Sequence, residues 1–253
     1  MENIPLYWIF FLTLGLSYFF ALSGLGAAML LMPIFHSLGF PINTAKSVAL
    51  LANGLSLTAA TFDNLRSGRI DLKLGLPIII FSFVAAPVGA YVSTFIDTNL
   101  ILWLFVAFLV FAGTSALLPK KEGEAACQDK RPKMVTLSII GTVAGLLSGM
   151  LGIGGGGIIS ALMLRMGCHA KKIAVITALA VPFSSFSGFF AYAAGGHISW
   201  PVVATVAAAA LLGGYAGNKT MQTALPEKFI KRAIGIVSLL FAAKILFDLL
   251  TSS

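Results

Sequence analysis

Residues 149–157 read Gly-Met-Leu-Gly-Ile-Gly-Gly-Gly-Gly, and this stretch lies inside a long apolar segment that extends from 134 to 164. A glycine in a helix interior costs about 1 kcal/mol relative to alanine, so a helix does not continue through so many of them. The segment is therefore predicted to form two helices with a break between them. Residues 23–28, Ser-Gly-Leu-Gly-Ala-Ala, predict a corresponding break in the apolar segment 6–38.

The sequence around both breaks is that of an integral membrane protein. Of its 253 residues, 58% are apolar and only 10% are charged, whereas an ordinary soluble domain carries about 25% charged residues. Several apolar segments reach the roughly 18 to 20 residues that a helix needs to cross the hydrocarbon. Runs such as 76–90 are apolar on every face, which argues against the alternating strands of a β-barrel. We expect an all-α polytopic membrane protein with about seven or eight transmembrane segments, including helices broken at glycine.

The two halves of the chain resemble each other. Sliding the sequence against itself pairs Gly24 with Gly152, Gly26 with Gly154, Ser56 with Ser184 and Gly89 with Gly217. Such internal similarity indicates a duplication. We predict a first membrane repeat in residues 1–118, a linker in 119–133 and a second membrane repeat in 134–253. After its broken segment, each repeat is predicted to contain three more: 45–65, 74–95 and 100–118, then 173–194, 201–218 and 233–250.

Basic residues lie on opposite sides of the corresponding segments in the two repeats. In the first repeat they follow segment 45–65, at Arg66, Arg69 and Lys73. In the second they precede segment 173–194, at Arg165, Lys171 and Lys172. Cytoplasmic loops are enriched in Lys and Arg, so the two repeats are expected to be inverted, as in many secondary transporters. We expect a multi-pass membrane protein, with the linker 119–133 in the cytoplasm and both termini on the outer side of the membrane.

The two breaks are the predicted binding site. Irregular backbone at membrane depth is tolerated only where protein buries it or where it lines a polar cavity. The free N–H groups and positive dipole at the start of each following helix would favour an anion. The residues expected there are Ser23, Gly24 and Gly26 in the first repeat and Ser148, Gly152, Gly154, Gly155 and Gly156 in the second. Alternatively, glycines only let helices approach closely, which is the reading we adopt for scattered ones such as Gly89 and Gly141.

Polar residues in the segments after the breaks extend this candidate site. They are Lys46, Asn53 and Ser56 in the first repeat and Thr177, Ser184 and Ser185 in the second. Lys46 would offer a positive charge to an anion, although a lysine near a helix end also commonly extends to the membrane surface. The amide and hydroxyl groups would line a polar path, or they would only form hydrogen bonds between helices. The sequence leaves both readings open.

The glycine-rich stretch 148–156, in a chain of this size with two related halves, resembles the sulfite exporter TauE/SafE family, also called toluenesulfonate uptake permeases. The resemblance covers essentially the whole chain. It implies a secondary transporter that moves sulfite, sulfonates or related small organic anions across the bacterial inner membrane. We expect it to work by alternating access. The first half departs from the family pattern, because Ala27 and Ala28 stand where further glycines are usual.

The sequence does not indicate an enzyme. It lacks paired catalytic carboxylates, a metal-binding cluster, a nucleophile motif and a phosphate-binding loop, so we expect no cofactor. Transport would then draw on the membrane potential or on an ion gradient, with proton coupling as one candidate. The net charge of +8 does not point to nucleic acid, because the Lys and Arg residues cluster at the ends of the apolar segments.

The expected partners are a small anionic substrate and the lipid bilayer, and the sequence leaves the oligomeric state open. Two other functions share these sequence features. A passive anion channel would need the same polar path. A non-transporting membrane scaffold for sulfur metabolism would instead have its breaks sealed by bulky apolar side chains.

Overall fold

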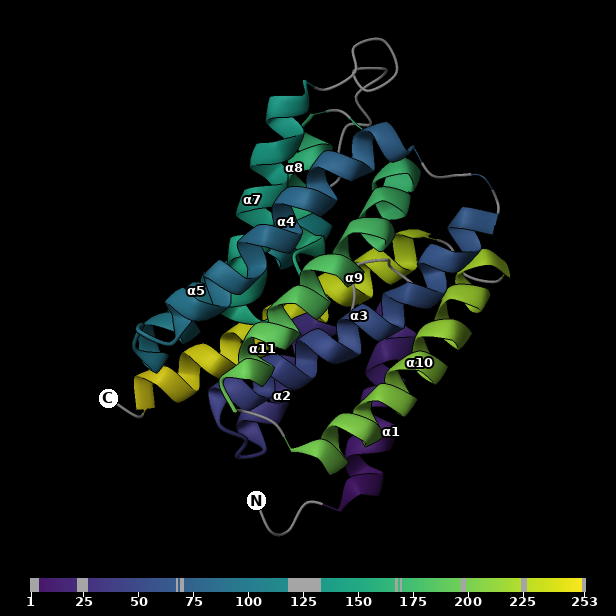
Figure 1. Cartoon of the computed structure of the whole chain (residues 1–253). Helices are drawn as coiled ribbons and strands as arrows, with labels where there is room; N and C mark the ends of the chain where they lie inside the picture. Colours follow the sequence, from purple (N-terminus) through teal and green to yellow (C-terminus); the bar gives the residue numbers. More distant parts are fainter. Residues whose placement is uncertain are drawn as a thin grey trace.

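The computed structural model describes residues 5–21, 27–66, 68, 71–117, 133–166, 168, 170–196, 199–223 and 227–251. Every regular element within these ranges is a helix, which confirms the all-α prediction, and Figure 1 shows the helices packed in one bundle. The helices of the first half are α1 (Leu6–Ala21), α2 (Ala28–Ser37), α3 (Ile42–Arg66), α4 (Leu72–Ser93) and α5 (Thr98–Leu117). Those of the second half are α7 (Met134–Leu151), α8 (Gly156–Arg165), α9 (Ala170–Ala194), α10 (Trp200–Thr223) and α11 (Glu227–Thr251).

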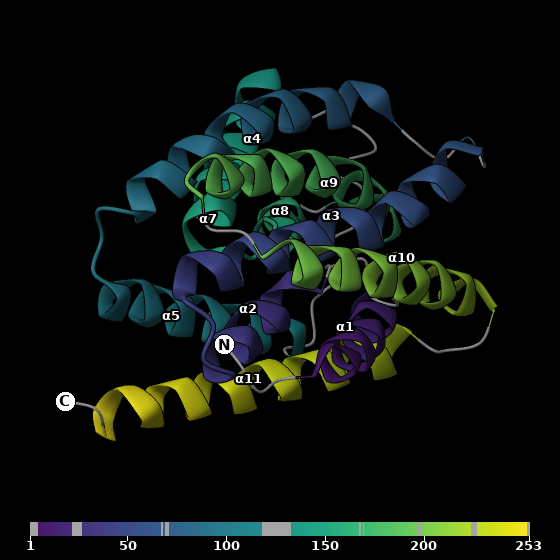
Figure 2. The ribbon, with the colours of Figure 1, turned by 60° about the horizontal axis from the view of Figure 1, so that its bottom comes forward.

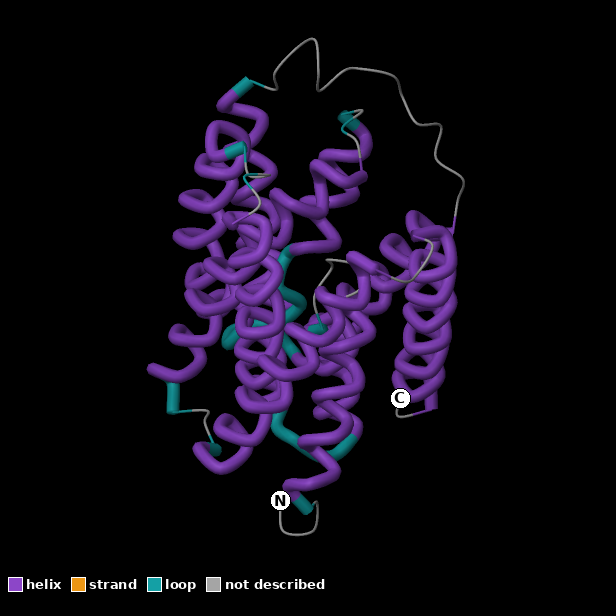
Figure 3. Tube along the Cα trace, turned by 90° about the vertical axis from the view of Figure 1, so that its right-hand side faces the viewer, coloured by secondary structure: helices purple, strands orange, loops and turns teal. Residues whose placement is uncertain are grey.

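The predicted break in segment 134–164 is confirmed, because α7 ends at Leu151 and α8 begins at Gly156. Segment 6–38 likewise contains two helices, α1 and α2, on either side of residues 22–26, which lie outside the described ranges. The helices that follow the breaks, α2 and α8, are both 10 residues long, too short to cross a bilayer alone. Figure 3 shows loop segments at mid-height within the bundle, with helices above and below them.

Five of the described helices are long and apolar enough to cross a membrane: α4, α5, α7, α9 and α10. Helices α1 and α2 are apolar but shorter. The outer surface of the bundle is also apolar, as on α4, where Phe83, Val84, Val88 and Tyr91 are exposed. Side chains of this kind are stable against lipid rather than water. The molecule is therefore a membrane protein, and its exact number of spans stays a prediction.

Most of the packing is between the two halves. Helix α4 packs on α7 and α10 packs on α1, while α3 packs on α9 and α5 packs on α11. Figure 2 shows α3 between α9 and α10, and α11 alongside α5. Helix α9 also packs on α4, as α3 packs on α10. When α1–α5 are matched in order with α7–α11, the α4–α7 contact corresponds to α1–α10, and α4–α9 corresponds to α3–α10. The contacts α3–α9 and α5–α11 each correspond to themselves. Two halves related by a twofold axis would have this pattern of contacts.

Glycines make the closest of these helix contacts possible. A Cβ atom placed on Gly141, Gly145 or Gly149 of α7 would overlap the α4 backbone, and one on Gly89 of α4 would overlap the carbonyl of Leu146 in α7. The backbone has no flexible end that could move aside. The packing interpretation of Gly89 and Gly141 is therefore confirmed.

Candidate functional site

The break between α7 and α8 is built from glycines in the left-handed backbone region. The φ angles are +72° at Gly152, +78° at Gly154 and +73° at Gly155, where other L-residues lose about 1 to 2 kcal/mol each. The N–H of Gly152 donates a 2.8 Å hydrogen bond to the carbonyl of Ser148, which closes the last turn of α7. The chain then starts α8 at Gly156, and all of residues 151–156 are buried.

Asn53, in the middle of α3, contacts both broken segments. Its Oδ1 accepts a 3.3 Å hydrogen bond from the N–H of Ala28, at the start of α2. Its Nδ2 donates to the hydroxyl of Ser185 at 3.0 Å and lies so close to Gly154 that a Cβ there would overlap it. Since no nearby side chain caps the start of α2, Asn53 supplies an acceptor from another helix. One buried amide thus joins the start of α2 to the break between α7 and α8.

Lys46, near the start of α3, lies against the second break. Its Cα, Cβ and Cγ pack against Gly152, where an added Cβ would approach them to within 2.8–2.9 Å. The residue is 0% exposed, so it does not extend to the membrane surface, and that alternative is wrong. Within the described residues its Nζ has no hydrogen-bond partner. The end of α7, next to the lysine stem, carries the partial negative charge of a helix terminus.

Tyr192 of α9 stands over this lysine. The Lys46 Nζ lies 5.8 Å from the centre of the tyrosine ring, a cation–π distance. The Tyr192 hydroxyl donates to the carbonyl of Gly149 at 2.7 Å and lies 2.7 Å from the Ser93 hydroxyl of α4. The side chain therefore connects Lys46, the last turn of α7 and the end of α4.

Replacing Tyr192 by phenylalanine is expected to destabilise the protein by about 1 to 3 kcal/mol, because the ring remains but the Gly149 carbonyl loses its buried donor. The measurement is the midpoint of thermal unfolding in detergent. Tyr91→Phe is the matched control, because the Tyr91 side chain is 67% exposed. Equal midpoints for the two variants would show that the Tyr192 hydroxyl contributes nothing.

Several buried polar groups of α3 and of the last turn of α7 lack a hydrogen-bond partner in the described structure. The hydroxyls of Ser47, Ser56 and Ser148 are buried and, like the Lys46 amine, have no hydrogen-bond partner among the described residues. Buried polar groups normally find partners, and each one left unpaired costs about 1 to 3 kcal/mol. A bound species with several acceptor oxygens would satisfy a lysine ammonium and serine hydroxyls together.

The predicted site residues do not all meet at one point. Lys46, Asn53, Ser184 and Gly154 lie around the second break, and the Ser184 hydroxyl is 3.4 Å from the Gly154 carbonyl. Ser56 is buried where α3 meets α10, with its backbone against Gly214. Thr177 lies beside α8, with its hydroxyl 3.4 Å from that of Ser160. The predicted residues Ser23, Gly24 and Gly26 lie outside the described ranges.

Sequence reasoning missed Tyr192 and Ser93. Neither belongs to a glycine break, and the pairing of their hydroxyls depends on α4 and α9 lying together in space. One signal was available in the sequence, because Tyr192 carries a polar group deep in the otherwise apolar segment 173–194. Such a hydroxyl needs a partner when it is buried.

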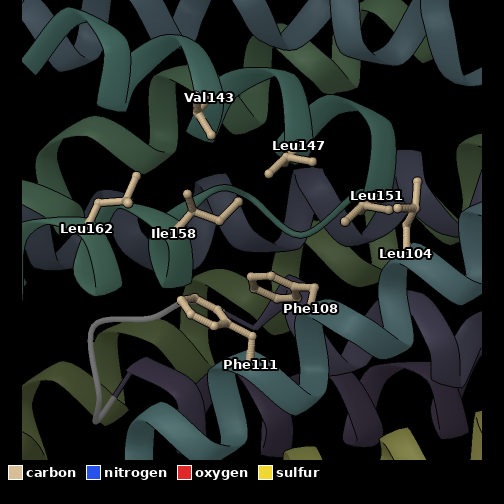
Figure 4. A pocket seen from close by; sticks show the side chains of 8 residues that line it. All are labelled: Leu104, Phe108, Phe111, Val143, Leu147, Leu151, Ile158 and Leu162. Carbon is tan, nitrogen blue, oxygen red and sulfur yellow. The ribbon is translucent and has the colours of Figure 1, made fainter. Parts of the chain in front are cut away.

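An apolar cavity of about 270 Å³ lies beside the break, between α5, α7 and α8. Figure 4 shows Ile158, which follows the break, opposite Phe108 and Phe111, and Leu151, which precedes the break, toward the end of this space marked by Leu104. Its lining consists of Leu104, Phe108, Phe111, Val143, Leu147, Leu151, Ile158 and Leu162. The side chains that line this cavity are all apolar, so it does not extend the candidate anion site.

The sequence matches a known family and known relatives along most of its length. Residues 9–245 match the family described as sulfite exporter TauE/SafE. The chain is 27% identical to the probable membrane transporter protein YunE of Bacillus subtilis, over 90% of this chain and 92% of that protein. It is 26% identical to the probable membrane transporter protein YdhB of the same organism, over 86% and 89%. A probable membrane transporter protein of Methanocaldococcus jannaschii is 24% identical over 82% and 83%.

No solved structure gives a significant match. The family match covers both halves and both broken segments, so it extends well beyond the glycine-rich stretch. The chain belongs to the sulfite exporter TauE/SafE family of membrane transporters.

Proposed function

We propose that this protein is a secondary transporter of small anions, with sulfite, sulfonates and related organic anions as the substrate class. The observation that carries the proposal is Lys46, a fully buried lysine whose amine has no hydrogen-bond partner among the described residues. An isolated buried charge costs several kcal/mol unless a counter-charge joins it. A bound anion at the break would supply that counter-charge.

The position of the site supports transport rather than static binding. It lies where the two halves meet, with Lys46 and Asn53 from α3 on one side and Gly152, Gly154 and Ser184 from the second half on the other. Transporters with inverted repeats bind their substrate at such an interface and move one part against the other. The pairwise correspondence between the helix contacts of α1–α5 and those of α7–α11 supports that repeat architecture and an alternating-access mechanism.

The same inversion supports a multi-pass topology in the inner membrane with the linker 119–133 in the cytoplasm and both termini in the periplasm. The basic residues Arg66, Lys73 and Lys172 would then lie on the cytoplasmic side. Labelling of single cysteines introduced at residue 3 and at residue 123, from outside intact cells, tests this arrangement. Labelling at 123 but not at 3 would reverse it.

Flux through the purified protein in liposomes tests the function. We expect saturable uptake of labelled sulfite or methanesulfonate, driven by an imposed gradient, with acetate as a carboxylate comparison. Flux that rises linearly with concentration and cannot be driven uphill would instead indicate a passive channel. The absence of flux for all three anions would favour the scaffold function.

Replacing Lys46 by methionine, a side chain of similar length without charge, is expected to reduce anion uptake at least about a hundredfold, because several kcal/mol of charge pairing is lost. The measurement is the initial rate of uptake per folded protein. Lys244→Met on α11 is the matched control, because Lys244 is exposed. An uptake rate near that of the unmodified protein in Lys46→Met would exclude Lys46 from the site.

A further inference from the structure

We propose that Lys46 carries a proton across the membrane together with the anion. In this proposal the amine is protonated while an anion occupies the site, and it releases that proton when the anion leaves. The inference rests on the proposed function and adds the coupling ion, the stoichiometry and the group that carries the proton.

The surroundings of Lys46 make its charge depend on the substrate. Its amine makes no hydrogen bond or ion pair within the described residues. The helices with the most contacts to α3 are α1, α2, α9 and α10, and the end of α7 lies against Lys46 itself at Gly152. Among the described residues of these elements, the titratable group that faces the amine is Tyr192 of α9. The described ion pair between Lys172 and Asp71 is a separate contact, at 3.4 Å between partly exposed side chains.

No carboxylate in the described structure therefore holds the ammonium form of Lys46 in place when the site is empty. A charged amine without a hydrogen-bond acceptor bears a large cost of desolvation, which the Tyr192 ring offsets only in part, whereas the neutral amine does not bear this cost. A bound anion removes this penalty by supplying both acceptor oxygens and a counter-charge. Proton binding and anion binding must then strengthen each other by the same factor, because such coupling is reciprocal.

The balance of charge follows directly. The neutral amine takes up a proton to become an ammonium, and the ammonium binds one monovalent anion, so the loaded site is neutral, as the empty site is. Tyr192 is not an equivalent carrier, because its hydroxyl already donates to the Gly149 carbonyl and lies against Ser93. A monovalent anion should therefore cross with one proton and without net charge movement.

The test follows proton movement during uptake of methanesulfonate into liposomes that contain the unmodified protein and a pH-sensitive dye. Methanesulfonate is the anion of a strong acid, so it brings no proton of its own. We expect the interior to acidify by one proton for each anion taken up, at a rate that does not change when potassium and valinomycin clamp the voltage.

Uptake without acidification, accelerated by a positive interior potential, would overturn the inference while leaving the proposed transporter intact. The absence of saturable uptake for both methanesulfonate and sulfite would instead contradict the proposed function. These outcomes need only the unmodified protein, so they do not depend on whether any variant folds.

Lys46→Arg provides a second, independent test. Arginine keeps its proton in proteins, so it can bind the anion but cannot return to the neutral empty state. We expect net uptake to fall at least about tenfold, while exchange of labelled for unlabelled methanesulfonate across the membrane falls much less. Lys46→Met should lose both activities. Net uptake by Lys46→Arg with the proton ratio of the unmodified protein would show that another group carries the proton.

Discussion

Replacing Gly154 by alanine is expected to abolish anion transport. The new Cβ would overlap the amide nitrogen of Asn53 and meet the Ser185 hydroxyl at 3.0 Å. To make room, Asn53 would have to leave a position in which it binds both Ser185 and the N–H of Ala28. The substitution therefore disrupts the link between the second break and the start of α2. It also carries the backbone cost of about 1 to 2 kcal/mol for a left-handed alanine.

Gly196→Ala separates these two effects. Gly196 has the same φ of +78°, but no atom lies within 4 Å of the added Cβ. This control therefore has the backbone cost without the collision, and we expect it to transport anions at nearly the rate of the unmodified protein. The measurement is saturable uptake in liposomes, normalised to the protein that elutes as a single folded species. Normal uptake by Gly154→Ala would remove the second break from the site.

Replacing Gly149 by alanine is expected to have the largest effect on folding. Its Cβ would overlap the carbonyl of Ala86 in α4 and approach the backbone nitrogen of Ala90 to 2.7 Å. Overpacking commonly costs about 1 to 3 kcal/mol even where side chains can adjust, and here the obstacle is a helix backbone. Helices α4 and α7 would have to move apart, which also disturbs the hydrogen bond from Tyr192 to Gly149.

The control for this prediction is Gly15→Ala in α1, where no atom lies within 4 Å of the added Cβ. We expect this variant to be as stable as the unmodified protein or more so, by up to about 1 kcal/mol, because alanine favours the helix. The measurement is the thermal unfolding midpoint in detergent together with the yield from the membrane. Equal midpoints for Gly149→Ala and Gly15→Ala would mean that the α4–α7 contact is looser than the structure shows.

The helices and the second break could be predicted from the sequence because local chemistry determines them. The length of the apolar segments and the glycines at 152 and 154–157 act on neighbouring residues along the chain. The predicted segment 134–164 accordingly corresponds to α7 and α8 within one residue at its far end. Burial of most of the candidate site residues also followed from their positions in apolar segments.

The partners of these residues could not be predicted in the same way. Asn53 binds Ser185, which is 132 residues away in the sequence, and this pairing depends on the angle at which α3 crosses α9. The choice between a surface and a buried Lys46 depended on whether Gly152 would pack against its stem. Ser56 and Thr177 were grouped in one site by their sequence positions, but they do not meet in the structure. Ser56 contacts α10, and Thr177 contacts α8.

Because helices of the first half pack on helices of the second half, the two halves depend on each other during biosynthesis. The glycine face of α7 is covered by α4, and α10 covers α1, so each half completes the surface of the other. During translation, α4 is synthesised before α7. The surface of α4 that later contacts α7 is therefore exposed to lipid until the second half has been made. A ribosome that stalls in the linker 119–133 would therefore leave an orphaned half, which quality-control proteases could recognise by its uncovered helix faces.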